Sequence, residues 1–219
     1  STKDGGKTWK FQRSGTGENL NKIYLADDKH GIIVGDNGVI LTTTNGGAKW
    51  ELQESGTENN LLGFALSPDG MVAVGQGGIA MRYSVDAEKL PVEMPPVVDA
   101  IEPGEDEVPT VEEVVYHWEI VRQATWQTDF SDTYFLDAML GWAVGANGVI
   151  AHTTDGGKTW KPQHSGVDSN LQLITFADPS YGWIVGSGML LRTEDGGKTW
   201  QIVKGVLQNF GRISTMKFI

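Results

Sequence analysis

The chain has 219 residues, no cysteine and a formal net charge of −11. This length suits one all-β domain or two small domains with a sizeable core. The lack of cysteine excludes disulfides and thiolate metal sites.

One eight-residue phrase opens the chain and returns along it. TKDGGKTW occupies residues 2–9, and its copies are TTNGGAKW at 43–50, TTDGGKTW at 153–160 and TEDGGKTW at 193–200. Trp ends each copy, and Trp118 continues the spacing of about 40 residues without the rest of the phrase. A second motif, of the type GWAVG, keeps the same register at 31–35, 71–75, 141–145 and 182–186. Two markers in one register indicate an internal repeat.

Each repeat is predicted to contain four short strands. In the last repeat these are 171–178, 182–186, 189–193 and 199–205, separated by turns rich in Gly. First strands are expected at 21–27, 61–67, 133–139, 173–179 and 213–219. Four strands in about 40 residues, without a 3.6-residue apolar period, are typical of a β-propeller blade. We therefore predict an all-β fold: a single β-propeller domain over 1–219, with four complete blades and split pieces of at least one more.

The two ends of the sequence are predicted to hold the split pieces. The chain begins with the fourth strand of one blade, at Trp9, and stops after a first strand, 213–219. First strands lie at the hub of a propeller and fourth strands at its rim, so these two strands could not pair directly. We favour a fragment of a longer propeller. The alternative is an intact chain that exchanges strands between protomers, as a homo-oligomer.

An acidic, proline-rich segment interrupts the second blade. Residues 91–114 hold eight carboxylates and no Lys or Arg, so they account for most of the net charge. They fall between the expected third and fourth strands, where they replace a hairpin turn. We expect a solvated loop, and a segment that binds a partner or regulates binding is the alternative.

The repeated phrase is interpreted as structural. It is expected to form a hairpin turn between the third and fourth strands, in which a carboxylate accepts backbone N–H groups and Trp packs between strands or blades. Copies of a repeated element lie around a ring, whereas the groups of a catalytic site must converge on one point. The structural residues are Asp4, Trp9, Asn45, Trp50, Asp155, Trp160, Asp195 and Trp200.

The phrase resembles the Asp box, Ser/Thr-x-Asp-x-Gly-x-Thr-Trp, of BNR-type propellers. The wider pattern is similar to the repeat of the photosystem II stability/assembly factor family, and the resemblance is carried by 141–145, 148–150, 153–160 and 165–166, with matching copies on both sides. That family implies a propeller in the thylakoid lumen or bacterial envelope, with an arginine-rich surface that holds a membrane-protein assembly intermediate. The resemblance therefore implies a periplasmic, lumenal or extracellular location, with any signal or anchor outside this sequence.

Two sets of residues are candidates for partner binding. The first are arginines that recur in pairs, one pair on third strands and the other four residues after a Trp. The second are asparagines in the loops that join a fourth strand to the next first strand, on one face of the ring. The candidates are Arg13, Arg82, Arg122, Arg192, Asn19, Asn59 and Asn170.

The expected function is that of a non-enzymatic scaffold that binds a protein partner in an envelope or membrane-associated complex. No catalytic residue, metal site or cofactor is predicted, because the four His residues show no i, i+4 pair and no GxSxG motif occurs. Nucleic acid is not an expected partner of so acidic a chain, and no run reaches the roughly 18 apolar residues of a membrane span. The alternative is a secreted sialidase-like glycoside hydrolase or a glycan-binding propeller, which would need Arg, Tyr and Glu clustered at the hub.

Overall fold

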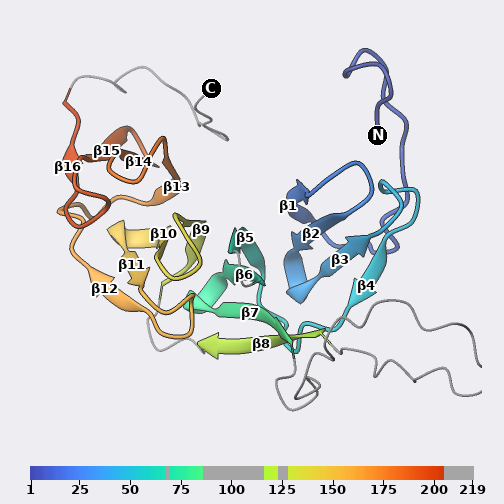
Figure 1. Ribbon diagram of the computed structural model, residues 1–219, viewed down its shortest axis with the longest axis horizontal. Coiled ribbons are helices and arrows are strands. Elements are labelled where there is room, and N and C mark those ends of the chain that lie inside the picture. The colour runs from blue at the N-terminus through green and yellow to red at the C-terminus, as the bar shows by residue number, and fades with distance from the viewer. Residues whose placement is uncertain (68–69, 86–115, 123–127, 205–219) are drawn as a thin grey trace, which may run out of the picture.

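Four sheets of four antiparallel strands make up the described part of the chain. The structure is a computed structural model that describes residues 1–67, 70–85, 116–122 and 128–204. Within each sheet the strands lie in chain order, each paired with the next. Figure 1 shows the sheets as blades around an open arc, with first strands on the inside and fourth strands on the outside. The predicted all-β propeller with four complete blades is confirmed.

The blades are numbered along the chain. Blade 1 consists of β1 (Leu20–Leu25), β2 (Gly31–Gly35), β3 (Ile40–Thr43) and β4 (Glu51–Gln53). Blade 2 consists of β5 (Leu61–Ser67), β6 (Gly70–Gly75), β7 (Ala80–Val85) and β8 (Tyr116–Arg122). Blade 3 consists of β9 (Phe130–Phe135), β10 (Gly141–Gly145), β11 (Ile150–Thr153) and β12 (Lys161–Gln163). Blade 4 consists of β13 (Leu171–Phe176), β14 (Gly182–Gly186), β15 (Met189–Thr193) and β16 (Gln201–Ile202).

The core lies between neighbouring blades, because alternate residues of a strand point to opposite sides of its sheet. We call the side of a blade that packs against the preceding blade its leading face, and the opposite side its trailing face. Ile32, Val34 and Ile40 on the trailing face of blade 1 pack against Leu61 and Phe64 of blade 2. Each fully buried aliphatic side chain contributes about 1.5–3 kcal/mol relative to an exposed one.

The other two interfaces repeat this arrangement. Between blades 2 and 3, the cluster contains Val72, Val74, Ala80, Phe130, Phe135, Ala151 and Trp160. Between blades 3 and 4, it contains Trp142, Val144, Ile150, Leu171, Ile174, Phe176, Leu191 and Trp200. The recurring GWAVG motif therefore supplies the trailing face of each blade, because its second and fourth residues point toward the next blade.

Glycine in the turn between second and third strands is required by close backbone contacts. In blade 3, a Cβ on Gly145 would lie 1.9 Å from the carbonyl oxygen of Asp129. Gly148 has a φ of +69°, and a Cβ there would lie 1.8 Å from the carbonyl oxygen of Val167. Any larger residue would push these chain segments apart, which explains why both glycines recur in the repeat.

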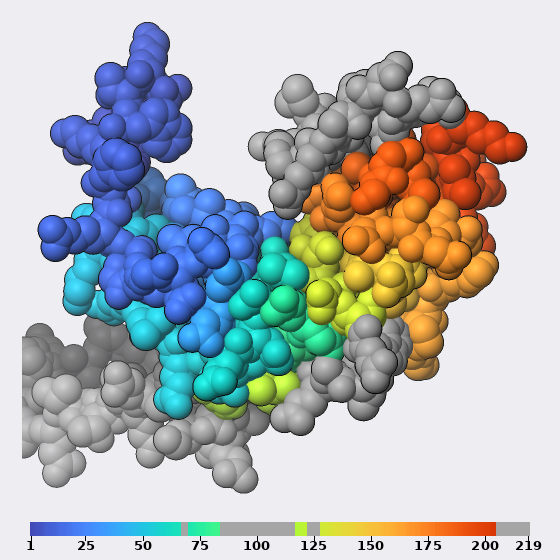
Figure 2. Space-filling model, turned by 180° about the vertical axis from the view of Figure 1, so that it is seen from behind, coloured from blue at the N-terminus to red at the C-terminus, as the bar shows by residue number. Residues whose placement is uncertain are grey.

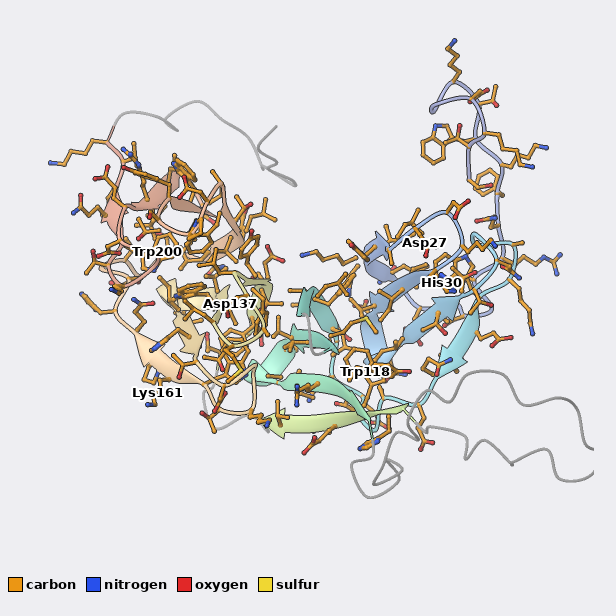
Figure 3. The ribbon with its side chains drawn as sticks, in the orientation of Figure 1. Asp27, His30, Trp118, Asp137, Lys161 and Trp200 are labelled. Atoms are coloured by element: carbon orange, nitrogen blue, oxygen red, sulfur yellow. The ribbon has the colours of Figure 1, made fainter. Side chains whose placement is uncertain are left out.

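The first strand of blade 3 lies earlier than predicted. We expected 133–139, whereas β9 spans Phe130–Phe135. The reason is Asp137, whose carboxylate accepts the N–H groups of Met139 and Leu140 at 2.8 and 2.7 Å and so forms a turn. Asp27 makes the same turn in blade 1, and Figure 3 labels both aspartates. An Asp shortly after the first strand is thus a second repeated turn residue, which the sequence analysis did not single out.

The predicted split pieces are described only at the N-terminus. Residues 2–9 form the expected turn, but no strand follows among residues 1–19. The segment 213–219 lies outside the described residues, as does the acidic segment 91–114. Strands β7 and β8 pair with each other although residues 86–115 separate them in the chain. The domain boundaries and the role of the acidic segment stay predictions.

Candidate functional site at the hub

The first strands of all four blades meet at the hub and present one equivalent position to it. In the strand registers, Lys22, Gly63, Asp132 and Leu173 each lie opposite the Val of the GWAVG-type motif. At this one position, blade 1 has a cation, blade 3 has an anion and blade 4 has an aliphatic group, whereas the Gly of blade 2 has no side chain. We call these four residues the hub position.

Asp132 is the centre of the hub position. It is 4% exposed, and its carboxylate is bonded to the ammonium group of Lys22 from blade 1. The backbone N–H of Ile174 in blade 4 donates to its other oxygen over 3.1 Å. Gly63 in blade 2 leaves room for this strand, since a Cβ there would lie 2.8 Å from the Asp132 Cα. One residue of blade 3 therefore contacts all three other blades.

Burial raises the pKa of Asp132, and the Lys22 charge and hydrogen bonds from Lys22 and from the backbone of Ile174 and Thr133 oppose that effect. A buried carboxylate with these partners is held in place by them, because each hydrogen bond and the opposite charge offset part of the cost of desolvation. The pair is therefore assigned to holding the blades together.

A pocket of about 390 Å³ opens beside the hub position. It is lined by Lys22, Ile23, Tyr24, Phe64, Ala65, Leu66, Asp132, Thr133, Tyr134, Phe135, Leu173, Ile174 and Thr175. Its walls are apolar and aromatic: Tyr24 meets Phe64 edge to face at 5.9 Å, and Tyr134 stacks on Phe176 at 5.3 Å. Burial raises the pKa of the Tyr134 hydroxyl, so this group stays protonated as a hydrogen-bond donor.

Carboxyl groups are scarce in the described lining of this pocket. Among the residues that line it, Asp132 is the one carboxylate, and it is already bonded to Lys22. Glycoside hydrolysis through the usual pair of carboxyl groups needs an acid and a second carboxylate on opposite sides of the bond to be cleaved. The described lining instead offers aromatic and aliphatic surface with a few hydroxyl groups.

The Asp-box residues form local turns between the third and fourth strands. The Asp155 carboxylate accepts the backbone N–H of Thr159 at 2.9 Å and its hydroxyl at 2.5 Å. The hydroxyl of Thr153 donates to the same carboxylate at 2.7 Å, and the indole of Trp160 donates to the Gly157 carbonyl at 3.0 Å. Equivalent carboxylate bonds occur around Asp4 and Asp195.

The copy without an Asp keeps the same backbone bond. In 43–50, the amide oxygen of Asn45 accepts the N–H of Lys49 at 2.9 Å and the hydroxyl of Thr43 at 3.0 Å. An amide oxygen can replace the carboxylate because the turn needs an acceptor more than a charge.

The Trp residues of the repeat differ in burial. Trp118, Trp160 and Trp200 are 8–9% exposed, Trp50 is half-buried, and Trp9 is 71% exposed. Trp160 and Trp200 each meet a Phe of the first strand of their own blade edge to face. Trp9 has no such strand in the described part of the chain, so its ring faces solvent.

The candidate arginines are distributed over different blades. Arg13 is exposed in the N-terminal segment, and Arg82 and Arg192 occupy equivalent positions on β7 and β15 with blade 3 between them. Arg192 bonds to Glu194 at 2.8 Å and lies 5.4 Å above the ring of Tyr181. Arg122 ends β8, and its side chain lies outside the described part. The structure does not bring these arginines into one cluster at the hub.

The candidate asparagines lie where adjacent blades join. The side chain of Asn170, at the start of blade 4, accepts the backbone N–H of Asn147 in blade 3 at 3.0 Å. The equivalent residue of blade 2 is Asn60, which accepts the N–H of Asn37 at 2.9 Å, so the predicted Asn59 is one residue out of register. Asp129 does the same for blade 3 by accepting the N–H of Gly77 at 2.8 Å. We call this recurring bond the inter-blade latch.

Sequence reasoning missed the hub position because its residue types differ from blade to blade. A search for internal repeats detects positions that hold the same residue in each copy. The hub position holds Lys, Gly, Asp and Leu in the four copies, so such a search does not detect it. The available signal was one charged residue on each of two first strands whose other residues are uncharged: Lys22 on β1 and Asp132 on β9. In the parts of the chain that the structure describes, no group of three or more His, Cys, Asp or Glu could hold a metal ion. No helix in those parts is long and apolar enough to cross a membrane.

Comparison with known proteins identifies the type of repeat. Residues 110–210 match the family model described as photosynthesis system II assembly factor YCF48, so the resemblance noted from the repeat is confirmed. No curated protein matches the chain.

Solved structures share the fold at low identity. YCF48 bound to D1 peptide has a TM-score of 0.58 and 19% identity over 91% of this chain and 58% of that one. YCF48 from Cyanidioschyzon merolae has a TM-score of 0.57 and 19% identity over 80% of this chain and 50% of that one. An ancestral GH74 enzyme has a TM-score of 0.61 and 13% identity over 91% of this chain and 26% of that one. The chain thus spans 50–58% of the length of the two YCF48 structures.

Proposed function

Residues 110–210 carry the repeat of the photosystem II assembly factor YCF48 family, and on this premise we propose that the chain is a non-enzymatic propeller scaffold that binds a segment of a protein partner. The observation that carries the proposal is this family match. A second support is the fold shared with a YCF48 structure whose ligand is a D1 peptide. The proposed partner class is a membrane protein during its assembly, and the proposed location is the periplasm, the thylakoid lumen or the cell exterior.

The hub pocket supports binding of a polypeptide segment. Its volume of about 390 Å³ accommodates a few side chains, and its rim offers Tyr24 and Leu66, which are 40% and 38% exposed. Exposed aromatic and aliphatic groups beside a preformed apolar pocket are typical of the anchor sites that bind peptide side chains. We therefore place the proposed contact at Leu66 and its neighbours.

A peptide-binding measurement tests the proposal. A fluorescent D1 peptide titrated with the purified chain is expected to show saturable binding by anisotropy, and a peptide of scrambled sequence is expected to bind at least tenfold more weakly. Leu66→Asp is expected to weaken binding tenfold or more, because a carboxylate at the pocket rim would have to be desolvated. The matched control is Ile202→Asp, since Ile202 is 50% exposed on β16, away from the hub.

Two outcomes would contradict the proposal. One is equal binding of the D1 and scrambled peptides. The other is hydrolysis of aryl sialosides or other aryl glycosides at a rate that depends on the protein, which would support the glycosidase alternative. Peptide binding that Leu66→Asp leaves unchanged would keep the function and move the contact away from the hub.

A further inference from the structure

Two residues after the hub position, the four first strands again present one equivalent position, and its side chains alternate in size. In the strand registers these residues are Tyr24, Ala65, Tyr134 and Thr175, and all four line the hub pocket. Figures 1 and 2 show blade 2 between blades 1 and 3, so the blade that carries the small Ala65 lies between the two blades that carry tyrosines. We call Tyr24 and Tyr134 the hub tyrosines.

The hub tyrosines are held in place by phenylalanines of other blades. Tyr24 of blade 1 meets Phe64 of blade 2 edge to face at 5.9 Å, and Tyr134 of blade 3 stacks on Phe176 of blade 4 at 5.3 Å. Among the described residues, neither tyrosine hydroxyl donates a hydrogen bond, so both donors are available to a ligand. Aromatic rings that are oriented before binding lose little entropy when a ligand packs on them.

The charges in the described lining of the pocket cancel. Lys22 and Asp132 are its charged residues, and they are bonded to each other. A ligand carboxylate beside Lys22 would also lie near Asp132, and a ligand cation beside Asp132 would also lie near Lys22. Neither gains a net attraction that offsets its desolvation, so the pocket favours an uncharged segment.

The neighbouring blades already use backbone groups on the inner edges of the sheets. The first strands form these edges, and a free edge can accept an added strand. The side chain of Asn21 donates to the Leu61 carbonyl of β5 at 2.9 Å, and the Ile174 N–H of β13 donates to Asp132 at 3.1 Å. A strand added at these positions would have to displace both bonds, so a ligand is better recognised through its side chains and carbonyl groups.

We infer, on the premise of the proposed function, that the hub pocket binds an uncharged, proline-containing segment of the partner in the polyproline II conformation. Such a segment has no internal hydrogen bonds, its prolines have no N–H groups, and its carbonyls are free to accept. Grooves lined by aromatic side chains bind it through ring contacts and hydrogen bonds to those carbonyls. Here the proline rings pack on the hub tyrosines, the Tyr134 hydroxyl donates to a carbonyl, and Ala65 leaves space for the segment.

Fluorescence anisotropy with two labelled peptides of equal length tests the ligand class. The first is a run of six prolines flanked by glycines, and the second alternates Thr and Val, which favours a strand. The proline peptide is expected to bind saturably and at least tenfold more tightly than the Thr-Val peptide. The D1 peptide of the functional test is titrated in parallel, so that the two proposals are measured separately.

Two variants of the pocket test the contacts. Tyr134→Phe removes one hydroxyl donor and keeps the ring, so it is expected to weaken binding of the proline peptide about fivefold. Ala65→Leu fills the space on blade 2 and is expected to weaken it at least tenfold. Tyr181→Phe is the matched control, because Tyr181 is 39% exposed and lies outside the pocket lining. Circular dichroism and urea denaturation of each variant check that the fold is kept.

The outcomes separate this inference from the proposed function. Binding of the D1 peptide without binding of the proline peptide would overturn the inference and leave the proposed function standing. Equal binding of the proline and Thr-Val peptides would also overturn it, as would proline-peptide binding that Tyr134→Phe and Ala65→Leu leave unchanged. Proline-peptide binding that both variants weaken supports the inference even if the D1 peptide does not bind. If neither peptide binds, both proposals fail.

Discussion

The Asp-box turns and the hub position hold the molecule together in opposite ways. In an Asp box, the bonds of Asp155 reach residues two and four positions away. At the hub, Lys22 bonds to Asp132, 110 positions along the chain. The turns are nearly identical in sequence and each stabilises one blade, whereas the hub residues differ from blade to blade and join separate blades. The Asp boxes, which repeat, therefore stabilise single blades, whereas the hub position, which departs from the repeat, joins separate blades.

Removing the hub carboxylate is expected to have the largest effect. Asp132→Ala leaves the Lys22 ammonium and the Ile174 N–H without their acceptor, so the free energy of unfolding should fall by about 3 kcal/mol in urea denaturation. The double variant Lys22→Met/Asp132→Asn removes the charge and keeps an acceptor, so it should lose less than Asp132→Ala alone. A loss below about 1 kcal/mol for Asp132→Ala would show that the hub pair does not hold the blades together.

Filling the space at Gly63 is expected to have the next largest effect. A Cβ at this position would lie 2.8 Å from the Asp132 Cα and 3.1 Å from the Ser131 carbonyl oxygen. Gly63→Ala should therefore lower the free energy of unfolding by about 2 kcal/mol, because backbone must move. Gly17→Ala is the control, since a Cβ on Gly17 would have nothing within 4 Å. Equal free energies of unfolding for the two variants would mean that the backbones of β5 and β9 can move apart around the added methyl group without loss of stability.

Breaking one Asp box is expected to have a smaller effect. Asp155→Ala removes the acceptor for the Thr159 N–H and hydroxyl, which should lower the free energy of unfolding by about 1 kcal/mol. Asp168→Ala, at an exposed loop position, should change it by less than about 0.5 kcal/mol. If Asp155→Ala and Asp132→Ala lowered the free energy of unfolding equally, the hub pair would contribute no more to stability than one Asp-box turn.

The pH dependence of stability should separate the two kinds of carboxylate. Hydrogen bonds, the Thr hydroxyl bond foremost, lower the pKa of Asp4 and Asp195 from 3.8 to about 2. Their contribution is present above pH 3.8 and is lost as the pH falls toward 2. Burial raises the pKa of Asp132, so its contribution has the opposite sign: stability falls as the pH rises through that raised pKa.

Urea denaturation as a function of pH measures both contributions. Asp132→Asn should remove the decrease in the free energy of unfolding that occurs as the pH rises above 3.8. The loss of stability below pH 3.8, which comes from the Asp-box carboxylates, should remain. An unchanged profile would show that Asp132 titrates as an ordinary carboxyl group.

The repeat let the sequence predict the four complete blades. It also predicted the strand order and turn positions, because these depend on residues within one period. The GWAVG motif and the Asp boxes lie where expected, and 182–186 and 189–193 are strands β14 and β15. The first strand of blade 3 was misplaced because the turn at Asp137 was read as strand. The partner-binding residues were predicted from their recurrence and stay predictions. In the strand register, Asn60 rather than Asn59 is the residue equivalent to Asn19 and Asn170.

The sequence by itself determined the four-stranded blades and the turns within them, since these follow from side-chain alternation, glycine geometry and hydrogen bonds over a few residues. Only the tertiary structure decided which positions converge at the hub and which apolar faces meet. Lys22 and Asp132 lie in different repeats, and Leu20 reads like the buried Leu171 until the neighbouring blade is placed. The contacts at the hub depend on how whole sheets pack, and no pattern within one repeat encodes them.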